Sequence, residues 1–78
     1  MGLMPRRHRA LTAFGLAVRR AREAKGLTQE KLAERAELDS AYISGIERGV
    51  RNASLISLVR VAKGLGVPLS ELCKGVAA

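Results

Sequence analysis

Apolar residues recur at three- and four-residue spacing along most of the chain. This spacing is typical of amphipathic helices, and no run of β-branched residues indicates a strand. The pattern predicts an all-α fold with five helices, over residues 11–25, 28–36, 40–48, 55–65 and 68–74.

Residues 28–49 form the centre of this pattern, as two short helices joined by a tight turn. Thr28 and Asp39 are suited to cap them, because a side-chain oxygen can accept a hydrogen bond from a first-turn N–H group. Helices this short bury too little surface to be stable alone. We therefore expect them to pack on a core made by the other helices, which leaves the outer face of the second one free to contact a partner.

The apolar residues of the fourth helix share one face, which we expect to meet the core. Ile56 projects to the opposite side, and Val61 lies at the margin. The shared face consists of Leu55, Leu58, Val59, Ala62 and Leu65.

The chain is long enough for one domain, which we place at residues 11–75, between a basic arm (1–10) and a short tail (76–78). The arm either contacts phosphates or a minor groove of a nucleic acid, or is a frayed terminus. The formal net charge of +7 indicates a polyanionic partner, although a merely basic surface is the alternative.

Several classes of function are not expected. The single Cys73 cannot form an internal disulfide or a zinc site, which fits a cytoplasmic protein. No apolar run is long enough to span a membrane, and no signal peptide is evident. We expect no enzyme activity, cofactor, metal or small-molecule ligand, because the sequence has one histidine, no phosphate-binding glycine loop and no separate ligand domain. General RNA binding is disfavoured by the scarcity of aromatic residues.

The motifs GLTQEKLAERA, LDSAYISGIERG, RN followed by SL, and LSEL occur in this order within residues 14–72. In this order the chain resembles the Cro/C1-type (XRE) helix-turn-helix domain of phage repressors and bacterial regulators. YISGIERG with the following RN and SL is most similar to the controller proteins of restriction–modification systems. The resemblance implies a lambda-repressor-like fold and a cytoplasmic, dimeric transcriptional regulator of a bacterium or phage. An antitoxin or protein-interaction module with the same fold is the alternative.

The resemblance also implies that the third helix enters the DNA major groove while the second lies across it. A phosphate would meet the N-terminus of the second helix, where N–H groups are free. The expected DNA contacts are Thr28, Gln29, Ser40, Ala41, Tyr42, Ser44, Gly45, Arg48, Arg51, Asn52 and Ser54.

The third helix is poor in side chains that read bases. Ala41 can contact only a thymine methyl group, and Ser40 pairs with any base. Gly45 has no side chain, and we expect it to allow close approach of the backbone to DNA. Phosphate contacts and DNA shape should therefore carry more of the specificity. Thr28 could serve as a cap alone, and Tyr42 could serve only in packing.

Two further features follow from the resemblance. Arg22 and Glu47 occupy positions at which the family pairs an arginine with a glutamate, so we expect a structural ion pair rather than catalysis. Glu37 stands where the family commonly has glycine in the turn. Either Glu37 adopts a left-handed conformation, at a cost of roughly 1–2 kcal/mol, or the turn differs.

The last third of the chain carries more apolar side chains than one small core can absorb. We expect a self-complementary patch that forms a symmetric homodimer on a pseudo-palindromic operator, with recognition helices ~34 Å apart. A monomer with scattered exposed apolar residues is the alternative. The expected interface residues are Ile56, Leu69, Leu72, Cys73 and Val76.

Overall fold

The computed structural model describes residues 8–76, which form five α-helices, as predicted. Most of the predicted basic arm, and the last two residues of the tail, lie outside this described range. The helices are α1 (Arg9–Ala24), α2 (Gln29–Ala36), α3 (Ser40–Glu47), α4 (Leu55–Leu65) and α5 (Leu69–Leu72).

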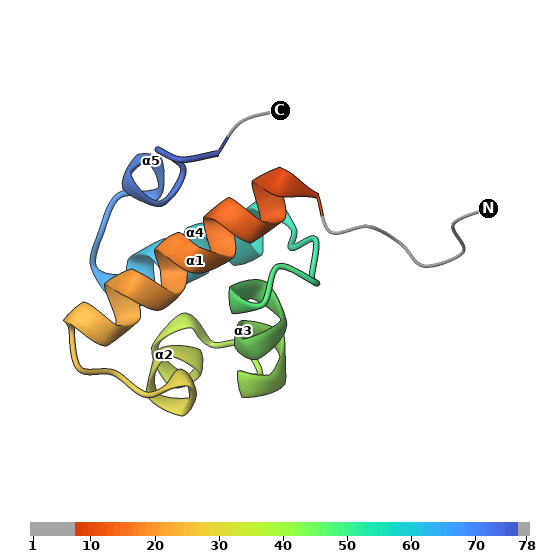
Figure 1. The fold of residues 1–78 in the computed structure, drawn as a ribbon. Coiled ribbons are helices and arrows are strands. Elements are labelled where there is room, and N and C mark those ends of the chain that lie inside the picture. The colour runs from red at the N-terminus through yellow and green to blue at the C-terminus, as the bar shows by residue number, and fades with distance from the viewer. Residues whose placement is uncertain (1–7, 77–78) are drawn as a thin grey trace.

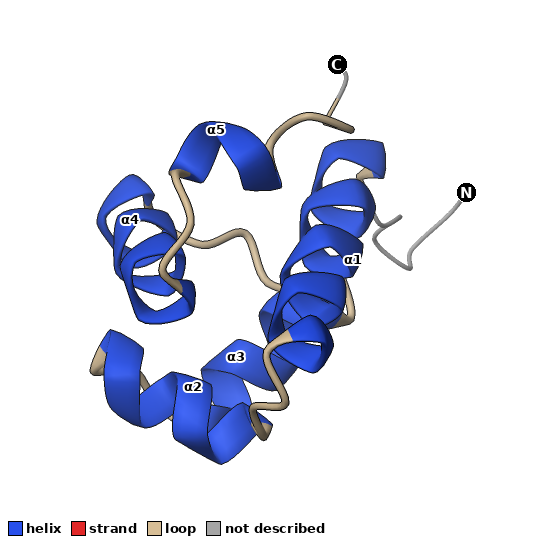
Figure 2. Ribbon diagram, turned by 90° about the vertical axis from the view of Figure 1, so that its left-hand side faces the viewer, coloured by secondary structure: helices blue, strands red, loops and turns tan. Residues whose placement is uncertain are grey.

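The five helices enclose a single core that is aliphatic except for Phe14. Figure 1 shows α2 and α3 side by side below α1 and α4, with α5 near the C-terminus at the opposite end. Seen from the side, α1 and α4 stand on opposite sides of the core, and α2 and α3 close it from below (Figure 2). The buried apolar residues are Phe14, Val18, Leu32, Ala33, Ala36, Ile43, Ile46, Val61, Ala62, Leu65 and Leu72. Within the described range, no helix is both long and apolar enough to cross a membrane.

Local hydrogen bonds explain where the helices begin. The side chains of Thr28, Asp39 and Ser54 each accept a hydrogen bond from an N–H group in the first turn that follows, and the caps at Thr28 and Asp39 were predicted from their positions. α1 begins two residues earlier than expected, because the Nδ1 atom of His8 accepts from the Ala10 N–H group at 3.0 Å. α5 is shorter than expected and follows Pro68 directly.

The turn between α2 and α3 contains the one non-glycine residue with positive φ in the described chain. Glu37 ends α2 at φ 58° and ψ 44°, in the left-handed region. The turn therefore keeps the geometry that glycine would give it, and Glu37 adopts the strained backbone. Its N–H group still donates to the Glu34 carbonyl at 3.2 Å.

The predicted core face of α4 is wrong in part: Ala62 and Leu65 are buried and Leu58 packs against the core, but three other positions differ. Val61, expected at the margin, is fully buried, whereas Leu55 and Val59 are 66% and 47% exposed. The cause lies in Gly64, where a Cβ atom would lie only 3.2 Å from the Ala36 nitrogen of α2. Because this glycine lets the backbones approach closely, α4 turns the side that carries Val61 and Gly64 towards α2.

A second close approach places α3 against α1. A side chain at Gly15 would collide with the backbone oxygen of Ile46 and would lie 2.7 Å from that of Glu47. The absence of a side chain at Gly15 therefore lets the end of α3 rest directly on α1. This contact positions the outer face of α3.

Candidate nucleic-acid interface

The outer face of α3 is small and polar. Ile43 and Ile46 are buried in the core, so the opposite side of the helix is free. Ala41 and Arg48 are exposed there, and Ser40 and Ser44 are partly exposed, as predicted. The Arg48 Nε atom lies 3.4 Å from the Ser44 hydroxyl oxygen, which keeps the guanidinium near the helix.

Gly45 does not leave an open path to the α3 backbone, so its predicted role in close approach to DNA is wrong. The residue is buried, and a Cβ atom there would lie 3.3 Å from the Arg51 Cβ atom and 3.8 Å from a Val50 methyl group. The Val50 N–H group donates to the Gly45 carbonyl at 3.0 Å. The space at Gly45 therefore receives the loop that follows α3.

Arg51 lies across α3 as a result. Its guanidinium carbon is 5.1 Å from the centre of the Tyr42 ring, within cation–π range. Tyr42 is half-buried and packs against the core, so packing accounts for much of its role. Arg51 and the adjacent Asn52 are exposed beside α3, where the sequence predicted them. Ser54 caps α4 and lies at the end of the same loop.

Glu47 joins three segments of the chain at the base of this surface. Its Oε2 atom accepts from Arg22 Nε at 2.6 Å, and its Oε1 atom accepts from Arg22 Nη2 and from Gln29 Nε2, both at 3.0 Å. Arg22 Nη1 also donates to the Leu27 carbonyl at 2.8 Å. The structure thus confirms the ion pair between α1 and α3. It also shows that Gln29, the first residue of α2, donates a hydrogen bond to the same carboxylate.

The ion pair is shielded from solvent. The Glu47 side chain is 3% exposed and that of Arg22 is 12% exposed. The hydrogen bonds to Glu47 raise the pKa of Arg22 above its ordinary value, although desolvation opposes the shift. Arg22 therefore remains charged at any ordinary pH, and the described chain leaves no buried side-chain polar atom without a partner.

The N-terminus of α2 lies at the edge of the same surface. Thr28 is exposed, and its hydroxyl accepts from the Lys31 N–H group at 3.0 Å, so capping occupies the side chain. The side chain of Gln29 is partly committed to Glu47, which the sequence did not indicate. The earliest N–H groups of a helix have no intrahelical partner and remain available for an anion.

Beside α3, an open recess of about 490 Å³ is lined in part by Arg19 and Arg48 and by the Arg22–Glu47 ion pair. Thr12 and Leu16 of α1 also line it, although neither was among the predicted contacts. The three- and four-residue spacing of Thr12, Leu16 and Arg19 was the signal that they share one side of α1.

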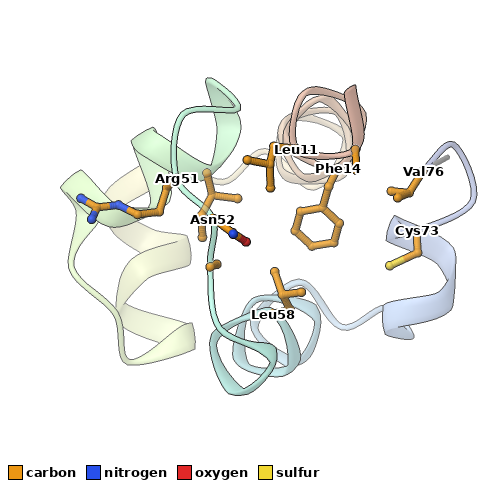
Figure 3. A pocket seen from close by; sticks show the side chains of 10 residues that line it. Leu11, Phe14, Arg51, Asn52, Leu58, Cys73 and Val76 are labelled. Carbon is orange, nitrogen blue, oxygen red and sulfur yellow. The ribbon is translucent and has the colours of Figure 1, made fainter. Parts of the chain in front are cut away.

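A second, apolar recess of about 150 Å³ begins at Arg51 and Asn52 of the loop after α3. Figure 3 shows Phe14 and Leu11 of α1 above it and Leu58 of α4 below it. Arg51 and Asn52 lie at its left end in this view, and Cys73 and Val76 lie at its right end.

The predicted dimer patch is not continuous. Leu72 is 2% exposed and belongs to the core, so its assignment to an interface is wrong. Leu69 and Cys73 are half-buried against the core. Ile56 is exposed, but it lies two positions from Leu58 and so projects to the other side of α4, away from the recess.

Comparisons with known proteins agree with this geometry. Residues 18–72 match the sequence model of a protein family described as helix-turn-helix. The control protein C.MunI from a Mycoplasma species is 45% identical over 60 residues, which cover 76% of this chain and 81% of that protein.

Two solved structures are also similar. The restriction-modification controller protein C.AhdI from Aeromonas hydrophila has a TM-score of 0.78 and 45% identity, covering 80% of this chain and 94% of that chain. The controller protein C.Esp1396I, a tetramer in complex with its natural 35 base-pair operator, has a TM-score of 0.76 and 40% identity, over 85% of this chain and 92% of that chain.

The Arg22–Glu47 pair leads to a prediction about stability. Arg22→Met should lower the free energy of unfolding by about 3–5 kcal/mol, because it leaves Glu47 as a buried carboxylate without a cation. The double variant Arg22→Met/Glu47→Leu should lose less, since it buries no charge. Urea unfolding followed by far-UV circular dichroism measures both values. Arg19→Met is the control, because its ion pair with Glu23 is exposed and should contribute within about 0.5 kcal/mol.

A double variant that is as unstable as the single one, or less stable, would show that the cost does not come from an unpaired charge.

Proposed function

The chain belongs to the helix-turn-helix family, and from this premise we propose that it is a transcriptional regulator that binds specific double-stranded DNA. Similar proteins are named control or controller proteins, and one was solved on its operator. By extension, this chain is a controller of a restriction–modification operon and not an enzyme. It acts in the bacterial cytoplasm, at the nucleoid. An antitoxin role is not favoured, because these relatives are control proteins.

The observation that carries the proposal is a free helix face with cations on both sides. Arg19 and Arg48 line the recess between α1 and α3, and Arg51 crosses α3 at Gly45. When α3 lies in a major groove, the phosphate backbones pass on either side of it. These arginines, together with the N-terminus of α2, are placed to meet phosphates.

The outer face of α3 supports modest base recognition. Ala41 offers a methyl group for a thymine, and Ser40 and Ser44 offer hydroxyls that pair with any base. Backbone contacts and DNA shape therefore supply a large part of the discrimination.

In a dimer, the fixed distance between the two α3 helices would supply the remaining discrimination between sequences. Val76 is exposed at the mouth of the apolar recess, and Leu55 is exposed at the start of the neighbouring α4. In a two-fold dimer, the same side chains of each copy can meet across the axis and cover both recesses. Two α3 helices about 34 Å apart would then reach successive major grooves.

Selection of bound duplexes from a random pool, followed by footprinting, tests this function. We expect a two-fold symmetric sequence whose halves are about one helical turn apart, because a symmetric dimer presents two identical faces. Sedimentation of the complex should give two chains, or a multiple of two, per duplex. Equal binding to all duplexes, or a single chain on an asymmetric site, would contradict the proposal.

Arg51 provides a residue-level prediction. Arg51→Ala should weaken binding to every duplex by a similar factor and lower the slope of log affinity against log salt by about one unit, because one phosphate contact is lost. Fluorescence anisotropy at several salt concentrations measures this slope. Lys74→Ala is the matched control, because Lys74 is an exposed cation of the α5 end, paired with Glu71. An unchanged slope in Arg51→Ala would remove Arg51 from the phosphate contacts.

A further inference from the structure

The outer side of α4 carries large apolar side chains that the core does not use. Ile56 and Val59 are 64% and 47% exposed. Ile56 and Val59 line an open groove of about 470 Å³ between α4 and the C-terminal end of α2. Exposed apolar groups gathered in a groove and rimmed by polar residues are typical of interaction sites.

The groove is strongly cationic as well as apolar. Arg35 of α2 and Arg60 and Lys63 of α4 line it, and Glu37 is the only acidic residue among its lining. Within residues 8–76, none of these three cations takes part in a salt bridge. The groove therefore combines an apolar strip with positive charges that can pair with the acidic groups of another molecule.

The groove is separate from the two surfaces already assigned. The candidate DNA surface is built from α1, α3, the N-terminus of α2 and the loop after α3, whereas the groove uses the opposite end of α2. The apolar recess takes Leu58, which projects from the other side of α4 than Ile56. A molecule in the groove can thus be present while DNA and a second copy are bound.

We propose that this groove binds a helical segment of a protein partner whose contacting face combines acidic and apolar side chains. An amphipathic helix laid between two helices buries its apolar face on Ile56 and Val59. Its carboxylates lie beside Arg35, Arg60 and Lys63, which complements the charge. Simultaneous binding of DNA rests on the proposed function, but binding of the acidic helix does not.

Two other occupants fit less well. Duplex DNA would gain the cations but would leave Ile56 and Val59 against a charged backbone. A second copy placed across a two-fold axis would bring the same three cations of each chain together, and like charges face to face are unfavourable.

The test uses the full chain, free and bound to the selected duplex, with methyl groups labelled for NMR. The probe is a designed helical peptide with glutamates and leucines along one face, and the control peptide carries lysines in place of the glutamates. We expect the methyl signals of Ile56 and Val59 to shift with the acidic peptide only, with and without DNA. The signals of Val76 should remain in place. Because the free chain is titrated too, peptide binding can still be measured if the chain fails to bind DNA.

Variants connect the signal to the groove. Ile56→Ser and Lys63→Glu should each weaken binding of the acidic peptide at least tenfold, about 1.4 kcal/mol. Lys74→Glu, which makes the same charge change at an exposed lysine outside the groove, should leave peptide affinity unchanged.

Three results would overturn the proposal. The acidic peptide could fail to bind, or bind no better than the lysine peptide. Duplex DNA alone could shift the Ile56 and Val59 signals, which would make the groove a nucleic-acid site. Ile56→Ser could convert a dimer into a monomer, which would make the groove an interface between copies.

Discussion

A buried carboxylate connects the parts of this protein that carry its candidate DNA surface. Glu47, at the end of α3, accepts hydrogen bonds from Arg22 of α1 and from Gln29 at the start of α2. Because an unpaired charge at this depth is costly, α3 cannot turn away from α1 without breaking these bonds. A helix of eight residues thus obtains an orientation that it could not maintain alone.

The rest of the surface depends on that orientation. α3 itself presents mostly small side chains, so the stronger contacts come from neighbouring segments. Arg51 reaches across the helix because Gly45 leaves room for it, and its guanidinium lies over the Tyr42 ring. Arg19 approaches from α1, on the other side of the recess. DNA recognition therefore depends on several segments that surround α3, and not on α3 alone.

Features set within one turn of the chain could be predicted from the sequence. The helix positions and the caps at Thr28 and Asp39 depend on neighbouring residues alone. The Arg22–Glu47 pair was expected only from the family resemblance, since no local pattern joins residues so far apart. Leu55 and Val61 show the limit: both are aliphatic, and only the close approach of α2 decides which one is buried.

The central claim is that Glu47 orients α3 for DNA recognition. Its most direct test is the affinity of Glu47→Gln for the selected duplex relative to a random duplex. A glutamine of similar size cannot satisfy all three donors, so the account predicts that this ratio falls at least about tenfold, or about 1.4 kcal/mol, while helix content is retained. An unchanged ratio, with both affinities equal to those of the parent or reduced alike, would contradict it.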